Sequence, residues 1–181
     1  MPQVTPERFA RIELLLLDVD GVLTDGRIIY TDSGEEVKAF HVRDGSGLKL
    51  WRRSGKRAAI LSGRTSPTVT RRAGELGIDL VVQGAGEKLP ALRRILQESG
   101  LQPDQVCAVG DDLPDFPVLL ACGLAVAVAD AVAELKAAAD FVTTLPGGQG
   151  AVREAIEWLM RGQGTWNAAV DPLRAHPFPP G

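Results

Sequence analysis

The stretch LLLLDVDGVLTDG, Leu14–Gly26, places an unbroken apolar run directly before a group of aspartates. Four consecutive leucines are typical of a strand buried on both faces of a parallel sheet, and they predict a strand over Glu13–Leu17. Asp18 and Asp20 stand where this strand ends. Neighbouring carboxylates repel one another unless a proton or a cation neutralises them, so this position predicts a functional site.

Short apolar runs alternate with amphipathic segments along most of the chain. Strands are expected at Glu13–Leu17, Arg57–Ser62, Leu80–Val82, Gln105–Val109, Leu124–Val128 and Phe141–Thr143. Helices are expected at Gly47–Ser54, Ser66–Leu76, Glu87–Ser99, Pro114–Cys122, Ala131–Ala138 and Gly150–Arg161. Such alternation requires right-handed crossovers and predicts an α/β fold, a three-layer α/β/α Rossmann-like parallel sheet with helices on both faces.

Two segments depart from this alternation. Gly26–Gly45 has two strand-like runs around the turn residues TDSG, which predicts a β-hairpin inserted after the first strand. Residues 164–181 are rich in proline and show no periodicity, which predicts a flexible C-terminal tail. We therefore expect one domain over residues 1–163, with its hairpin at 26–45, and a tail over 164–181.

Composition excludes some classes of partner. The 181-residue chain has a formal net charge of −3 and no basic stripe, which argues against binding to nucleic acid. Its longest apolar stretch is too short to span a membrane, and the N-terminus lacks the apolar core of a secretion signal. The two cysteines, Cys107 and Cys122, lie in apolar runs and predict buried thiols in a reducing cytoplasm.

Polar residues follow each of the predicted strands on the same side of the sheet. Ser62 and Gly63 follow the second strand, Lys88 stands at a helix start after the third, and GDDLPD follows the fourth. In open parallel sheets ligands bind beyond the carboxyl ends of the strands. We therefore expect these groups to converge on one crevice with Asp18 and Asp20.

The residue types predict phosphoryl transfer. Carboxylates with free coordination positions suit Mg²⁺, which also binds substrate phosphate. A carboxylate neutralised by metal can attack phosphorus and form an aspartyl-phosphate. A second carboxylate two residues on can protonate the leaving oxygen and later deprotonate the attacking water. Ser62 and Lys88 can stabilise the phosphoryl oxygens.

These motifs resemble the haloacid dehalogenase superfamily, with DVDGV, the serine of LSGR, Lys88 and GDDLPD as its four motifs. Over Ile12–Gln163 the chain is similar to the phosphatases that act on 3-deoxy-D-manno-octulosonate 8-phosphate (KDO 8-phosphate), through FHVRDGSGLKL, LSGRTSPTVTRRAGELGI and GGQGAVREAIEWLM. The resemblance implies a capless, Mg²⁺-dependent homotetramer of lipopolysaccharide sugar synthesis that acts on a small sugar-acid phosphate. Mn²⁺ and Co²⁺ are possible substitutes for Mg²⁺.

The resemblance also implies roles for individual residues. Asp18 would be the nucleophile and Asp20 the general acid/base, with Ser62 and Lys88 as further catalytic groups. Asp18 and Asp111 would bind the metal through their side chains and Asp20 through its carbonyl. Asp112 would support these ligands or reach the metal through a bridging water, and Asp115 would orient Lys88. The substrate would be bound by Asp20, His41, Val42, Arg43, Asp44, Gly45, Lys49, Gly63, Arg64, Arg72 and Lys88.

Several alternatives stay open at this point. A nine-carbon ulosonate 9-phosphate of the sialic-acid type could be the substrate, although Arg64 favours the eight-carbon acid. A non-catalytic tetramerisation module or a phosphoacceptor signalling domain would not need the full set of motifs. Arg43, which could form a surface ion pair with Asp44, and Arg72 could equally be solvent-exposed side chains.

The spacing of the motifs predicts assembly. The intervals between Asp18 and Ser62 and between Lys88 and Asp111 are too short for a cap domain. A phosphoryl-enzyme nevertheless requires shielding from bulk water, and a lone two-stranded hairpin is marginal in water. We therefore expect hairpins from several subunits to pair in a homotetramer, with the tail reaching a neighbouring site.

Overall fold

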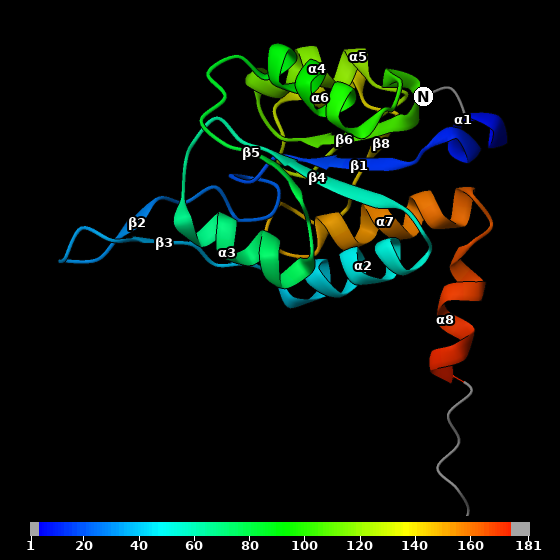
Figure 1. Ribbon diagram of the computed structural model, residues 1–181, viewed down its shortest axis with the longest axis horizontal. Coiled ribbons are helices and arrows are strands. Elements are labelled where there is room, and N and C mark those ends of the chain that lie inside the picture. The colour runs from blue at the N-terminus through cyan, green and yellow to red at the C-terminus, as the bar shows by residue number, and fades with distance from the viewer. Residues whose placement is uncertain (1–3, 175–181) are drawn as a thin grey trace, which may run out of the picture.

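The computed structural model describes residues 4–174 of the chain, and its centre is a six-stranded parallel sheet (Figure 1). The strand order is β5-β4-β1-β6-β7-β8. The strands are β1 (Leu14–Leu17), β4 (Arg57–Leu61), β5 (Leu80–Val82), β6 (Val106–Gly110), β7 (Leu124–Ala127) and β8 (Phe141–Val142). The predicted parallel sheet is confirmed.

The leucine run forms the middle of this sheet. All four residues of β1 are buried, and the strand pairs with β4 on one side and β6 on the other. Leu14 lies opposite Arg57 and Val106 in the two registers. A strand covered on both faces and paired on both edges must be apolar throughout, which explains why no polar residue interrupts it before Asp18.

Helices cover both faces of the sheet, as predicted. Figure 1 shows α2, α3 and α7 on one face and α4, α5 and α6 on the other. The α-helices are α1 (Pro6–Arg11), α2 (Val42–Arg53), α3 (Pro67–Leu76), α4 (Lys88–Ser99), α5 (Phe116–Ala121), α6 (Ala133–Ala138), α7 (Ala151–Gly162) and α8 (Trp166–Arg174). Short 3-10 turns cover Pro103–Gln105 and Leu113–Asp115.

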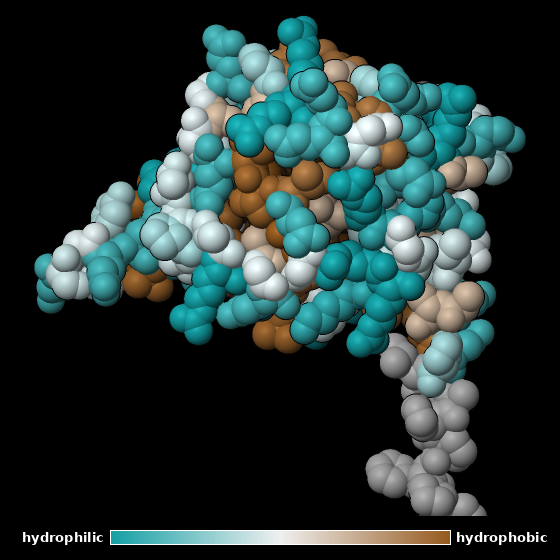
Figure 2. All heavy atoms as spheres, in the orientation of Figure 1, coloured by the Kyte–Doolittle hydropathy of each residue, from teal (hydrophilic) through white to brown (hydrophobic). Residues whose placement is uncertain are grey.

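The predicted hairpin follows β1 and stands apart from the main sheet (Figure 1). Its strands, β2 (Ile29–Tyr30) and β3 (Glu36–Val37), pair antiparallel. Ile28, Ile29, Tyr30 and Val37 are exposed, so the projecting arm carries apolar side chains among hydrophilic ones (Figure 2). Within residues 4–174 no cap domain is inserted, because this hairpin is the sole addition between β1 and α2.

Two sequence-based boundaries need correction. The helix expected from Gly47 begins at Val42, with His41 as its N-cap, so the residues up to Gly45 belong to this helix and not to the hairpin. Residues 166–174 form α8, whereas an irregular tail was expected from Gly164. Trp166 is buried beneath the guanidinium of Arg161, 5.0 Å from its ring centroid, and this packing favours a helix despite the nearby prolines. The tail beyond, residues 175–181, lies outside the described residues.

Candidate active site

The four motifs meet at the carboxyl edge of the sheet. Asp18 follows β1, Ser62 follows β4, Lys88 begins α4, and Asp111 follows β6. They line a hollow of about 350 Å³ whose walls consist of Asp18, Asp20, Gly26, Ser62, Gly63, Arg64, Lys88, Asp111, Asp112, Pro114 and Asp115. The expected convergence of these segments on one crevice is therefore what the structure shows.

Lys88 is a buried ammonium between two buried carboxylates. Its Nζ lies 2.8 Å from Asp18 Oδ1 and 2.6 Å from Asp115 Oδ1. The other oxygen of Asp115 accepts hydrogen bonds from the backbone N–H groups of Asp111 and Asp112, at 3.1 and 3.4 Å. Asp115 is thus fully engaged, and it holds Lys88 beside Asp18.

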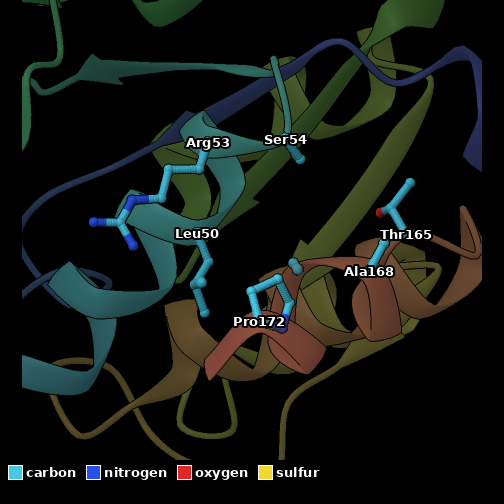
Figure 3. A pocket seen from close by; sticks show the side chains of 7 residues that line it. Leu50, Arg53, Ser54, Thr165, Ala168 and Pro172 are labelled. Atoms are coloured by element: carbon cyan, nitrogen blue, oxygen red, sulfur yellow. The ribbon is translucent and has the colours of Figure 1, made fainter. Parts of the chain in front are cut away.

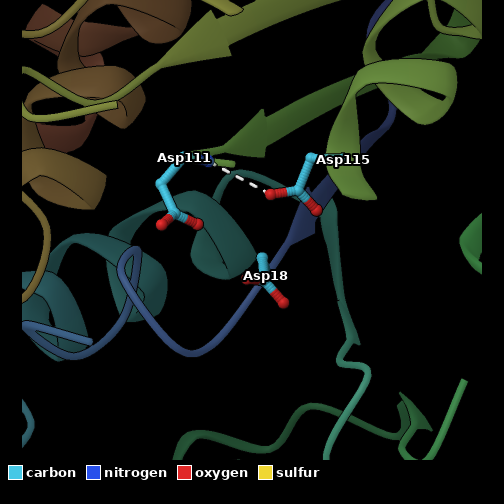
Figure 4. A group of neighbouring side chains, drawn as sticks. All are labelled: Asp18, Asp111 and Asp115. Atoms are coloured by element: carbon cyan, nitrogen blue, oxygen red, sulfur yellow. Dashed lines mark hydrogen bonds between the residues drawn. The ribbon is translucent and has the colours of Figure 1, made fainter. Parts of the chain in front are cut away.

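Asp18, Asp111 and Asp115 each offer an oxygen within 4.8 Å of the others (Figure 4). Burial, with the charges of Asp18 and Asp115, raises the pKa of Asp111 to about 8. Burial and the charge of Asp115 also raise the pKa of Asp18, against the opposing effect of Lys88. Asp111 Oδ1 is buried without a hydrogen-bond partner. A hard divalent cation would supply the missing positive charge and the missing partner, so Asp18 and Asp111 fit Mg²⁺, whereas both oxygens of Asp115 already have partners.

Ser62 faces the same hollow. Its side chain is buried, and its Oγ accepts a 3.3 Å hydrogen bond from the backbone N–H of Arg64. The hydroxyl proton is then available to a phosphoryl oxygen. Asp112 is the N-cap of the 3-10 turn Leu113–Asp115, and its Oδ1 accepts a 2.8 Å hydrogen bond from Leu113 N, so Asp112 has a structural contact in addition to its predicted role.

Two residues that the sequence analysis did not select, Lys38 and Glu36, contact lining residues of the hollow. Lys38 forms an ion pair with Asp20, and Arg64 Nη2 lies 2.5 Å from Glu36 Oε1. In sequence the segment EEVKAF shows ordinary charge alternation on a strand, so no local signal marks either residue. Their proximity to Asp20 follows from how the hairpin returns to the body of the molecule.

A glycine-rich loop, Gly147–Gly150, supports the site from outside its lining, and the sequence analysis did not select it. A Cβ on Gly147 would lie 1.7 Å from the carbonyl oxygen of Gly21, and Gly148 N donates to Val22 O at 3.0 Å. The loop therefore packs directly against the segment that carries Asp20. The glycines of GGQG indicate a close backbone contact, but the sequence does not show that the contact is with Gly21, which is remote along the chain.

The remaining predicted substrate residues lie elsewhere in the subunit. Asp44 is buried and accepts a 2.8 Å hydrogen bond from Arg153 N, which ties α2 to the start of α7. Arg72 pairs with Glu75 at 3.1 Å and faces the ring of Phe40. Within one described subunit, the hollow around Asp18 is not lined by His41, Val42, Arg43, Asp44, Gly45, Lys49 or Arg72.

Another hollow, of about 430 Å³, lies between α2 and α8 (Figure 3). Leu50, Arg53, Thr165, Ala168 and Pro172 are among its lining residues, which include no carboxylate. It therefore lacks the groups that phosphoryl transfer needs. In the part of the chain described, no helix has the length and apolar character needed to cross a membrane.

The fold and the site together define a haloacid dehalogenase-like hydrolase, and a family model of that description matches residues 72–156. The chain is 42% identical over 158 residues to the 3-deoxy-D-manno-octulosonate 8-phosphate phosphatase of Haemophilus influenzae, covering 87% of this chain and 88% of the relative. The Escherichia coli K12 phosphatase of the same name is 47% identical, with 87% and 84% covered. The chain belongs to this family of KDO 8-phosphate phosphatases.

Solved structures agree with this assignment. The phosphatase of Moraxella catarrhalis, solved with a magnesium ion, a phosphate ion and a KDO molecule, is 39% identical with a TM-score of 0.90, and 93% of this chain and 97% of that chain are covered. The cobalt-bound phosphatase of Haemophilus influenzae is 42% identical with a TM-score of 0.84, and the coverage is 87% and 92%.

Proposed function

We propose that this chain is a Mg²⁺-dependent phosphatase that hydrolyses KDO 8-phosphate to KDO and phosphate in lipopolysaccharide sugar biosynthesis. The observation that carries the proposal is the buried Asp18–Lys88–Asp115 chain beside the unpartnered oxygen of Asp111. A non-catalytic tetramerisation module would not need the ammonium of Lys88 buried beside the carboxylate of Asp18. The named relatives, at 42–47% identity over most of the chain, support the same substrate.

In the first step an oxygen of Asp18 attacks phosphorus, and the bond from phosphorus to the ester oxygen breaks. The ester oxygen takes a proton from the Asp20 carboxyl group and leaves as the sugar hydroxyl. Lys88 and Ser62 donate hydrogen bonds to the phosphoryl oxygens as charge develops on them. The products of this step are the free sugar acid, an aspartyl-phosphate at Asp18 and an Asp20 carboxylate.

In the second step a water molecule attacks the same phosphorus, and the bond to Asp18 breaks. Asp20 takes a proton from the water, which restores its carboxyl group and frees Asp18. The Asp18 and Asp111 side chains, with the carbonyl of Asp20, would hold Mg²⁺, which neutralises the crowded carboxylates and the phosphate; Mn²⁺ or Co²⁺ could take its place.

The class of reaction is tested by phosphate release from sugar phosphates before and after chelation. We expect turnover to be lost with EDTA and to return on addition of excess Mg²⁺, because the negative charges at the site then lack their counter-ion. Turnover that is insensitive to chelator would contradict the assignment of Asp111 as a metal ligand.

Arg64 supports a sugar-acid phosphate as the substrate, and the relatives named above support the eight-carbon acid over a nine-carbon ulosonate 9-phosphate. The Arg64 guanidinium stands at the mouth of the hollow, where a fork of donors can pair with a sugar-acid carboxylate. We expect Arg64→Ala to raise KM for KDO 8-phosphate by about 10–100-fold, since a charged hydrogen bond contributes about 1.5–3 kcal/mol. p-Nitrophenyl phosphate has no carboxylate and should show a change of less than about threefold. Equal effects on both substrates would remove Arg64 from the substrate site.

We propose a homotetramer built on the hairpins, with active sites shared between subunits. Two observations support it: exposed apolar residues on an isolated two-stranded arm, and predicted substrate residues that lie outside their own subunit's hollow. A neighbour that supplies His41–Gly45, Lys49 and Arg72 would complete the site. In this proposed assembly the C-terminal tail would reach a neighbouring subunit's active site.

Assembly is tested by substitution on the arm. We expect Ile29→Asp to lower the sedimentation coefficient from that of a tetramer and to reduce kcat/KM by about tenfold or more, because a charge in an apolar interface is costly. Asp32→Asn, at the exposed turn of the same hairpin, is the matched control and should change neither. A fully active monomer at micromolar concentration would contradict the proposal.

We also propose that the enzyme acts in the cytoplasm. Cys107 and Cys122 are both free thiols in the structure. Burial raises the pKa of both thiols, to about 12 for Cys122, so neither is a reactive thiolate. Unreactive, unpaired cysteines are typical of proteins in a reducing compartment.

A further inference from the structure

Four charged side chains form a cluster beside the active-site hollow: Asp20 and Arg64, which line it, and Glu36 and Lys38, which contact them. Lys38 follows β3, and its side chain is only 2% exposed although the hairpin that carries it projects into solvent. Its Nζ contacts Asp20 Oδ1 and lies 3.5 Å from Glu36 Oε1. A buried ammonium is unfavourable unless it is paired, and the carboxylates of Asp20 and Glu36 provide the pairing for Lys38. The partner Asp20 is the predicted general acid/base, so this contact can affect the chemistry as well as anchor the hairpin.

The two oxygens of Asp20 have different surroundings. Oδ1 accepts a hydrogen bond from the Lys38 ammonium. Oδ2 lies 3.7 Å from Arg64 Nε, which is too long for a hydrogen bond, and Asp20 itself lines the hollow. One oxygen is therefore occupied by a donor, while the other is available to a group bound in the hollow.

This asymmetry has a chemical consequence for a general acid. A protonated carboxyl group has one oxygen that accepts and one that carries the proton, and a lysine ammonium can only donate. Lys38 therefore requires Oδ1 to be the accepting oxygen, which leaves the proton on Oδ2. We propose that Lys38 is a positioning residue that orients the Asp20 carboxyl group, so that Oδ2 delivers the proton to the leaving oxygen and later takes one from water.

The inference rests on the proposed phosphatase function, and it predicts a dependence on the leaving group. Phosphoryl transfer from p-nitrophenyl phosphate releases a stable anion that needs no proton, whereas phenyl phosphate releases a poorer leaving group that does. The ratio kcat/KM reports the steps up to release of the alcohol and is independent of aspartyl-phosphate hydrolysis. Comparison of the two aryl phosphates therefore isolates protonation by Asp20 without need of the natural substrate.

We expect Lys38→Met to lower kcat/KM for phenyl phosphate at least about tenfold more than for p-nitrophenyl phosphate. The upper limit is the factor of about 10²–10⁴ that general acid–base catalysis contributes as a whole. Lys38→Arg, whose guanidinium also only donates hydrogen bonds, should keep the ratio of kcat/KM between the two substrates near its wild-type value. Lys56→Met is the matched control: Lys56 pairs with Glu13 at 2.7 Å on the chain segment before β4, and its loss should leave the ratio between the two substrates unchanged. If Lys38→Met fails to fold, Lys38→Gln serves for the same comparison.

A double variant separates positioning from anchoring of the hairpin. Because Lys38 acts through Asp20, adding Lys38→Met to Asp20→Asn should change the ratio between the two substrates by less than about twofold. Equal losses on both aryl phosphates in folded Lys38→Met, or full additivity in the double variant, would overturn the inference. Failure of the wild type to hydrolyse either aryl phosphate or any sugar phosphate would instead count against the proposed function.

Discussion

Asp18→Asn is expected to reduce phosphatase turnover by about 10⁴-fold or more, to the limit of detection. An amide is a poor nucleophile and a weaker metal ligand than a carboxylate, so both the attack on phosphorus and the binding of the cation are impaired. The substitution preserves the shape of the side chain and removes one negative charge from a crowded buried cluster, so the folded state should not lose stability. The measurement is phosphate release under saturating substrate and Mg²⁺.

Acid quenching of the reaction with labelled substrate provides the direct test of the intermediate. Wild-type enzyme should retain label on the protein, and Asp18→Asn should retain none. Asp25→Asn is the matched control, because Asp25 is an exposed aspartate of the same loop that lies 3.6 Å from Arg27. Turnover of Asp18→Asn close to that of the wild type would exclude the aspartyl-phosphate mechanism.

Lys88→Met is expected to lower both activity and stability. Its ammonium is the shared partner of Asp18 and Asp115, and removal of one member of a buried ion pair typically costs about 3–5 kcal/mol. The lost positive charge next to the phosphoryl oxygens should reduce kcat by about 10²–10³-fold. Arg94→Met, which breaks an exposed pair with Glu98 on the same helix, should lower the free energy of unfolding by less than about 1 kcal/mol.

The pH dependence of Lys88→Met distinguishes loss of the charge from loss of packing. Burial and Asp115 already raise the pKa of Asp18 above its ordinary value, and Lys88 opposes this rise. Without Lys88 the pKa should rise further. A carboxyl group with a raised pKa in the folded state contributes stability that is lost as pH rises, so the difference in Tm from the wild type should widen between pH 5 and pH 8. A pH-independent difference in Tm would indicate a packing defect alone.

The sheet was predictable from sequence because local patterns determine it. β5 falls on the residues expected, and β1 differs from its prediction by one residue, since apolar runs bounded by glycines and acids are local features. The start of α2 was not predictable in this way. The sequence pattern places Gly45 at the end of the hairpin and Gly47 at the first position of the helix. A Cβ at Gly47 would lie 2.9 Å from Arg153 Cδ, so this glycine allows α2 to approach α7.

The candidate site also contains some residues that the sequence predicts and others that it does not. Asp18, Ser62, Lys88 and Asp111 follow strands or begin a helix, and parallel topology alone brings them together. The contacts of Lys38 with Asp20 and of Gly147 with Gly21 join segments remote in sequence, and neither residue stands at a strand end. Charge alternation on a hairpin and glycines in a loop have many structural explanations, so only the three-dimensional arrangement links them to the chemistry.

The most direct test of the central claim is a side-by-side measurement of kcat/KM for KDO 8-phosphate and for a nine-carbon ulosonate 9-phosphate, with excess Mg²⁺ and purified wild-type protein. The Asp18–Lys88 centre predicts Mg²⁺-dependent hydrolysis. The identity of 42–47% to KDO 8-phosphate phosphatases predicts a preference of about tenfold or more for the eight-carbon substrate. A preference for the nine-carbon substrate, or no phosphate released from KDO 8-phosphate, would contradict it.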